Sequence, residues 1–247
     1  MNYDDFLATV ITEAAGLAAA ARTVGPDASV PSTPEWTMAK LVKHTGTTHR
    51  WATANVRAAA FSNPGDLDLG LPASEADYPD WIEAGAQSFV ELLRATDPDA
   101  PTWSWGVDQR VQFWARRMAH ETAVHRWDAQ SATGVQSPID APLAADGIDE
   151  QLENLPASAS FNSEAAAALT GRGESLHLHA TDVEGEWLIT FAPDGMTYAR
   201  EHAKGDLAVR GGASDLLLLM VGRRSLDGLE VFGDAGVLDA HAAITHF

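Results

Sequence analysis

Apolar side chains recur every three or four residues along the first half of the chain, which is the spacing of helices that bury one face. Four segments show this spacing, over residues 3–23, 37–60, 78–95 and 107–133. Gly25 and Pro26 end the first segment, and Pro34 and Thr37 are start signals for the second. Helices of this number and length predict an antiparallel four-helix bundle.

Beyond residue 156 the pattern changes to an alternation of apolar and polar residues, which is typical of strands. The predicted strands are ESLHLHAT, EWLITFAP, MTYAR, DLAVRG and GLEVFGD, and SDLLLLMVGRR before the last of them is a predicted helix. The segment EAAAAL at 164–169 fits either a helix or a linker. We expect antiparallel strands covered by one or two helices. The chain is thus predicted to hold a bundle over residues 1–150 and a small α+β domain over residues 156–247.

Charge and composition narrow the range of functions. The 247 residues include 16 Lys and Arg against 35 Asp and Glu, a formal net charge of −19, and no cysteine. Such a charge disfavours binding to nucleic acids and to anionic membranes. Without cysteine, disulfides, thiolate metal sites and cysteine nucleophiles are excluded, so any thiol chemistry requires an external thiol.

The first 25 residues give an expectation about location. They lack the basic region of a signal peptide, and four charged residues interrupt their apolar run: Asp4, Asp5, Glu13 and Arg22. We therefore expect a cytoplasmic protein without a membrane partner.

Candidate chemistry lies in RRMAHETAVHRWDAQ, residues 116–130. Its histidines, His120 and His125, are five residues apart, whereas the zinc-protease motif requires a separation of four. On a helix, Glu121 and His125 lie about 40° apart and one turn apart, whereas His120 and His125 are separated by about 140°. We expect Glu121 and His125 to point into the bundle. His120 should point toward a neighbouring helix and not be a ligand of a metal bound by Glu121 and His125.

A third donor must come from another helix. His44 lies on the same predicted face as Leu41 and Thr48, whereas His49 is turned about 140° away. Two imidazoles and one carboxylate can hold a catalytic zinc ion with a position left for water or substrate. The same donors form the facial triad of non-heme iron enzymes, and a hydrogen-bonded Glu–His pair beside a core histidine needs no metal. Spacing alone leaves these alternatives open.

Three segments together carry a resemblance to a known family. PEWTMAKLVKHTGTTHRW at 34–51, RRMAHETAVHRWDAQ at 116–130 and DLAVRGGASDLLLLMVGRRSLDGLEVFGD at 206–234 are similar, in order, to motifs of the mycothiol-dependent maleylpyruvate isomerase family. The resemblance implies a DinB-like bundle, a divalent metal on His44, Glu121 and His125, and a C-terminal domain related to sterol carrier proteins. Lys40 departs from the acidic residue expected there. Zinc is the metal we expect.

The resemblance also implies an activity. We expect an enzyme that uses mycothiol as a cosubstrate for isomerisation or S-transfer on a small, carboxylated electrophile. Arg223 and Arg224 are the candidate anchors for its carboxylate, and Trp51 and Trp114 are candidates for lining the cofactor site. We expect the substrate between the two domains, with the end of the SDLLLLMVGRR helix toward the metal. The alternative is a non-catalytic protein that contains a metal and binds a small molecule or lipid.

Overall fold

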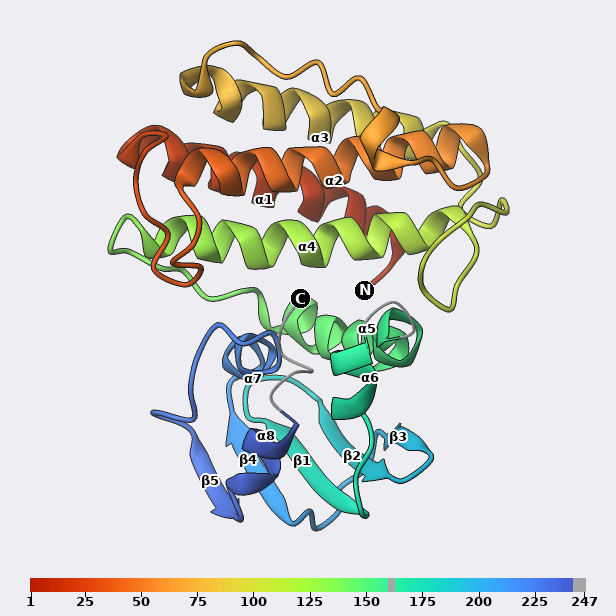
Figure 1. The fold of residues 1–247 in the computed structure, drawn as a ribbon, viewed down its shortest axis with the longest axis vertical. Helices are drawn as coiled ribbons and strands as arrows, with labels where there is room; N and C mark the ends of the chain where they lie inside the picture. The colour runs from red at the N-terminus through yellow and green to blue at the C-terminus, as the bar shows by residue number, and fades with distance from the viewer. Residues whose placement is uncertain (160–162, 242–247) are drawn as a thin grey trace. The chain divides into compact units, whose positions relative to one another are not determined.

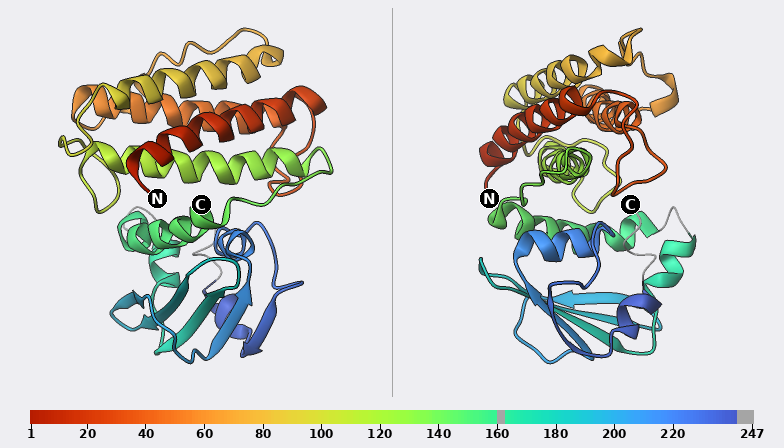
Figure 2. Two further views of the ribbon diagram at one scale, coloured as in Figure 1. Left: turned by 180° about the vertical axis from the view of Figure 1, so that it is seen from behind. Right: turned by 90° about the vertical axis from the view of Figure 1, so that its left-hand side faces the viewer.

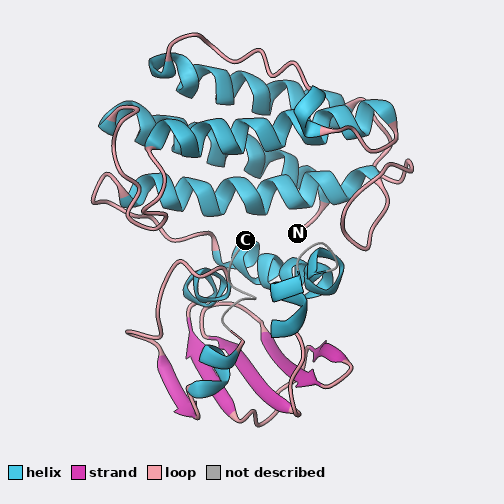
Figure 3. Cartoon of the chain, viewed as in Figure 1, coloured by secondary structure: helices cyan, strands magenta, loops and turns pink. Residues whose placement is uncertain are grey.

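The computed structural model describes residues 1–159 and 163–241, which fold as two compact units (Figure 1). The first unit contains residues 1–104 and 108–138, and the second contains residues 105–107 and the chain from 139 onward. Helices build the first unit, and a sheet with helices builds the second (Figure 3). The division at residue 138 comes earlier than the sequence suggested, because residues 139–150 include the start of a helix that belongs to the second unit.

Four long helices make up the bundle: α1 (Tyr3–Val24), α2 (Met38–Ala58), α3 (Tyr78–Arg94) and α4 (Val111–Ser131). Helix α1 packs against α3 and α4, and α2 packs against the same two helices (Figure 2). Asn2 caps α1, Gly25 ends it with a φ of 83°, and Thr37 caps α2. The predicted four-helix bundle is confirmed. Two short 3-10 turns, Pro64–Asp66 and Glu75–Asp77, lie between α2 and α3.

Helix α1 has the length and hydropathy of a membrane span, with 22 residues and a mean hydropathy of 1.3 over its most apolar window. Within the bundle its apolar side chains Leu7, Val10 and Leu17 are buried. An apolar face buried in a bundle core raises the mean hydropathy of a helix, and α1 packs against α3 and α4.

The second unit is built on a five-stranded sheet. Its strands are β1 (Glu174–Ala180), β2 (Glu186–Ala192), β3 (Gly195–Ala199), β4 (Leu207–Gly211) and β5 (Glu230–Gly233), in the spatial order β3-β2-β1-β4-β5. The expectation of an all-antiparallel sheet is wrong, because β1 and β4 are parallel neighbours. After the β1-β2-β3 meander the chain returns past β1 and adds β4 on its other side.

In the described part of this unit, four helices accompany the sheet: α5 (Ala141–Ala159), α6 (Ser163–Ala168), α7 (Ala213–Met220) and α8 (Gly236–Ala240). Trp187, Ile189 and Phe191 alternate along β2 and are completely buried on one face of the sheet. The Trp187 indole donates a hydrogen bond of 2.7 Å to Asp149 of α5, which places α5 on this apolar face. The opposite face carries the intervening, more polar residues.

Candidate metal centre

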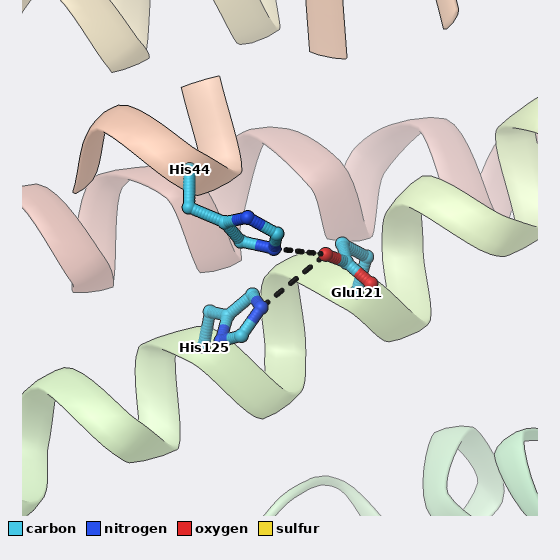
Figure 4. A group of neighbouring side chains, drawn as sticks. All are labelled: His44, Glu121 and His125. Atoms are coloured by element: carbon cyan, nitrogen blue, oxygen red, sulfur yellow. Dashed lines mark hydrogen bonds and ion pairs between the residues drawn. The ribbon is translucent and has the colours of Figure 1, made fainter. Parts of the chain in front are cut away.

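Three side chains from two helices of the bundle meet at one point. His44 projects from α2, and Glu121 and His125 project from successive turns of α4 (Figure 4). Nε2 of His44 and Nε2 of His125 each lie 3.2 Å from Oε1 of Glu121. The two imidazole rings are nearly perpendicular, with their centroids 5.0 Å apart. The structure therefore brings together the three residues that the sequence selected as ligands.

The donor set fits a divalent metal ion in type and spacing. One ligand atom from each residue lies within 4.8 Å of the other two. Donors at about 2.0–2.1 Å from a tetrahedral zinc ion are about 3.4 Å from each other, so the two 3.2 Å separations are close to what coordination requires. The side chain of His44 is 40% exposed and that of His125 is 7% exposed, so the centre is reached from the His44 side.

A second layer of polar groups fixes the orientation of two of these side chains. Nδ1 of His125 donates a 2.9 Å hydrogen bond to Oδ2 of Asp128, whose side chain is completely buried. Arg117 donates a 3.2 Å hydrogen bond to Oε2 of Glu121. A carboxylate behind a ligating imidazole is a recurrent feature of metal sites, because it sets the tautomer and raises the basicity of the ring. Here it leaves Nε2 of His125 facing Glu121 and His44.

The electrostatics of the group follow from its burial and its hydrogen bonds. Burial disfavours the charged form of Glu121, but hydrogen bonds with His125 and His44 outweigh it and hold its pKa well below the ordinary value. Burial also lowers the pKa of His125, but its hydrogen bonds to Asp128 and Glu121 outweigh that effect and raise the pKa to about 9. A persistent negative charge at Glu121 suits the binding of a cation.

Trp36 forms an aromatic wall beside the three ligand candidates. Its ring lies 4.8 Å from that of His44 and 6.1 Å from that of His125, and it stacks on the latter at 30°. The loop before α2 holds it in place, since Val30 N–H donates to the Trp36 carbonyl at 3.1 Å and Trp36 N–H donates to Thr33 at 2.8 Å. An apolar wall excludes water from one side of the centre and strengthens electrostatic interactions there.

The other two bundle histidines lie outside this group. His49 is completely buried, stacks on Phe89 and places Nε2 2.8 Å from the hydroxyl of Thr122. Because that hydroxyl donates to the carbonyl of Met118, it accepts from Nε2 of His49. His120 is buried edge-on against Phe6 of α1, with ring centroids 5.9 Å apart. Both orientations agree with the positions predicted from the helical spacing.

The tryptophans chosen from the sequence lie elsewhere in the bundle. Trp51 and Trp114 pack edge to face with centroids 5.3 Å apart, and Trp103 packs against both. Their indoles donate to the Ser62 and Trp103 carbonyls, respectively. Each is seven residues, or about two helical turns, from its nearest ligand candidate on the same helix. Their role in cofactor binding stays a prediction, and Trp36 is the indole that contacts the ligands.

The arginine pair follows α7 in the second unit. Arg224 binds the Asp215 carboxylate and donates a 2.8 Å hydrogen bond to the carbonyl of Asp227, so its guanidinium joins the start of α7 to the following loop. Arg223 donates to the carbonyl of Val221 at 3.0 Å. The anchoring role predicted for this pair stays a prediction.

Two family profiles cover most of the chain. The one described as Mycothiol maleylpyruvate isomerase N-terminal domain matches residues 7–130, and the one described as MDMPI C-terminal domain matches residues 142–240. The chain belongs to the mycothiol-dependent maleylpyruvate isomerase family. All three ligand candidates fall within the N-terminal family domain, and both arginines fall within the C-terminal one.

Solved structures of this family share the fold. A crystal structure of the mycothiol-dependent maleylpyruvate isomerase has a TM-score of 0.57 at 14% identity, and a point mutant of a mycothiol-dependent maleylpyruvate isomerase has a TM-score of 0.56 at 15% identity. In both comparisons 94% of this chain and 93% of the other are covered. Among curated proteins, none matches the chain by sequence. At this identity the maleylpyruvate isomerase structures support the fold and leave the activity of this chain to proposal.

Sequence reasoning missed three residues that contact the ligand candidates of the metal centre: Trp36, Arg117 and Asp128. Two of them carry a signal in the helical spacing, since Arg117 precedes Glu121 by four residues and Asp128 follows His125 by three. Trp36 lies in a loop, where helical spacing gives no direction for a side chain.

Proposed function

We propose that this protein is an enzyme that depends on a divalent metal, most simply zinc, and uses mycothiol for isomerisation or S-transfer on a small electrophilic substrate. The observation that carries the proposal is the convergence of His44, Glu121 and His125 within 4.8 Å of one another. Membership of the family adds mycothiol as the thiol and a maleylpyruvate-like carboxylate as the substrate class. A cytoplasmic location is part of the same proposal.

Each residue around the centre has a distinct task in this proposal. His44, Glu121 and His125 would hold the metal ion. When bound, a divalent cation supplies Lewis acidity and lowers the pKa of a thiol. Asp128 orients the His125 ring through the 2.9 Å hydrogen bond, and Arg117 positions Glu121 through its Oε2 atom. Trp36 shields the ligands from water on one side.

The chemistry uses a thiol that the chain itself does not contain, since it has no cysteine. The thiolate of mycothiol adds to a conjugated cis double bond of the substrate, and a carbanion forms at the neighbouring carbon, stabilised by the adjacent carbonyl. The former double bond is now a single bond and rotates. Elimination of the thiolate then restores the double bond in the trans form, so atoms and charge balance over the cycle. Protonation of the carbanion and release of the adduct would instead give S-transfer.

The substrate carboxylates require a cationic partner in a chain of net charge −19. We assign this role to the Arg223–Arg224 pair, because a guanidinium can bind a carboxylate through two hydrogen bonds. Within the pair, the bonds of Arg224 to Asp215 and to the Asp227 carbonyl favour a structural task for Arg224. Arg223 also has a contact within the unit, to the Val221 carbonyl, so we propose the anchoring role for the pair and leave the choice within it to single substitutions.

The experiment combines metal analysis with a thiol-dependence assay. The purified full chain is analysed for bound metals and assayed with maleylpyruvate and a panel of electrophiles, with and without mycothiol. We expect bound zinc and turnover that requires mycothiol, and the product distinguishes isomerisation from S-transfer. Bound metal without thiol-dependent turnover on any substrate would contradict the enzymatic proposal and favour a non-catalytic binding protein.

A further inference from the structure

A second group of metal-binding side chains lies in the other unit, on the face of the sheet opposite the buried Trp187. His177 and His179 occupy alternate positions on β1, so both point to this face. Glu186 begins β2 and is the register partner of His179, so its side chain points the same way. Neighbouring strands thus present two imidazoles and one carboxylate on the same face.

The third imidazole comes from the connection between β3 and β4. Strand β3 ends at Ala199, which pairs with Leu188 of β2, and Leu188 pairs with His177 of β1. Strand β4 begins at Leu207, which pairs with Leu176 of β1. Residues 200–206 must consequently cross β2 and β1 at the level of His177. His202 lies in this crossing segment.

The crossing segment lies close to the sheet because it contains a glycine at the point of contact. A Cβ atom at Gly205 would approach the backbone nitrogen of His177 to 2.9 Å and its Cβ to 3.2 Å. Only glycine allows this approach without displacing β1. The position of His202 over the two strands is therefore built into the local backbone.

The four side chains converge on a single oxygen atom. Oε2 of Glu186 lies 3.2 Å from Nε2 of His177, 3.2 Å from Nδ1 of His179 and 2.5 Å from Nδ1 of His202. One ligand atom each from His177, Glu186 and His202 lies within 4.8 Å of the other two. The three imidazole rings are close to mutually perpendicular, with centroids 5.7–6.2 Å apart.

His202 donates a hydrogen bond from Nδ1 to Oε2 of Glu186, but this bond leaves a buried nitrogen of the group without a partner in the described chain. His177 is only 5% exposed, and its buried Nε2 atom has no hydrogen-bond partner among the described residues despite its proximity to Glu186. A buried polar atom of this kind is unfavourable unless another species binds it. Nε2 of His177 points into the cluster, where an ion could accept its lone pair.

We propose that His177, Glu186 and His202 form a second divalent metal site, which binds zinc, with His179 as the fourth donor. Histidine nitrogen and carboxylate oxygen are ligands that zinc takes at its four-coordinate sites. Four protein donors would close the coordination sphere, which is typical of a structural metal. The ion would fasten the 200–206 crossing to β1 and β2. The site is independent of the proposed function of the bundle.

The test measures zinc stoichiometry and affinity on the full chain by equilibrium dialysis and chelator competition. Wild type is expected to bind two zinc ions, and a variant with His44→Ala and Glu121→Gln is expected to retain one. In that background, His202→Ala should weaken the remaining zinc at least about tenfold. The side chain of His202 is 79% exposed, so its removal leaves the buried core intact. Glu201→Gln, the exposed neighbour in the same segment, is the matched control and should bind zinc unchanged.

A stability measurement provides the second readout. Zinc should raise the Tm of the variant with His44→Ala and Glu121→Gln, called the bundle-site variant. Adding Glu186→Gln to this variant should abolish the increase. The site would be refuted if the bundle-site variant bound no zinc, or if His202→Ala and Glu186→Gln both left zinc affinity unchanged. If His44, Glu121 and His125 bind no metal, wild type should bind one zinc ion instead of two, and Glu186→Gln should bind none. This outcome separates the two proposals.

Discussion

The hydrogen bond between His125 and Asp128 offers a sharp test of the metal centre. Asp128→Asn preserves the size of the side chain and an oxygen that accepts from Nδ1, but removes the negative charge. In the structure the two atoms are 2.9 Å apart and the Asp128 side chain is completely buried, so no solvent replaces the lost charge. Loss of such a supporting carboxylate lowers metal affinity by about 10- to 100-fold, or about 1.4–2.7 kcal/mol.

The assay is competition for zinc between the full chain and a chromophoric chelator at constant pH. Asp80→Asn is the control, because Asp80 is an 81% exposed carboxylate of the same bundle that pairs with Arg22. We expect Asp80→Asn to retain wild-type affinity and Asp128→Asn to bind about 10- to 100-fold more weakly. Equal affinities in all three proteins would show that His125 does not depend on Asp128 for binding metal, and the assigned role of the carboxylate would be wrong.

Three further predictions concern the other histidines and the arginine pair. Burial lowers the pKa of His49 to about 4, so the ring stays neutral in the folded chain above that pH. Between pH 6.5 and pH 4 only the unfolded chain takes up this proton. From pH 7 to pH 4 the free energy of unfolding should therefore fall by about 3 kcal/mol more in wild type than in His49→Gln, measured by urea denaturation; equal slopes would contradict this. His120→Ala should bind as much metal as wild type, whereas His125→Ala should bind about one equivalent less, by elemental analysis; comparable losses would refute the helical-spacing argument. Arg224→Ala should lower Tm through loss of its bonds to Asp215 and Asp227, and at least one of Arg223→Ala and Arg224→Ala should raise KM for a carboxylated substrate; full activity in both would remove the anchoring role.

Much of the bundle was predictable because helical periodicity records which face each helix buries. The spacing of Glu121 and His125 gave their shared direction, and the phase of α2 added His44. The same reasoning separated His120 and His49 from the centre. It gave no direction for Trp36, since that residue lies in a loop held by backbone hydrogen bonds to Val30 and Thr33.

The second unit shows where sequence patterns are insufficient. Alternation identified β1 and β4 as strands, but an alternating pattern does not specify which strand lies beside which, so their parallel pairing was missed. Helix α5 was not predicted, and residues 141–150 were assigned to the bundle although they form the start of this helix of the second unit. The histidine cluster depends on that same topology, since the crossing of residues 200–206 brings His202 to β1 and β2.

The central claim is that His44, Glu121 and His125 hold a metal ion that mycothiol-dependent turnover requires. The most direct measurement removes metal from the full chain with a chelator and follows turnover of maleylpyruvate with mycothiol as zinc is added back. We predict that wild type loses turnover and regains it with zinc, and that Glu121→Gln regains none. Glu186→Gln keeps all three bundle ligands and should lose and regain turnover as wild type does. Full turnover in the metal-free protein, or equal recovery in Glu121→Gln, would contradict the claim.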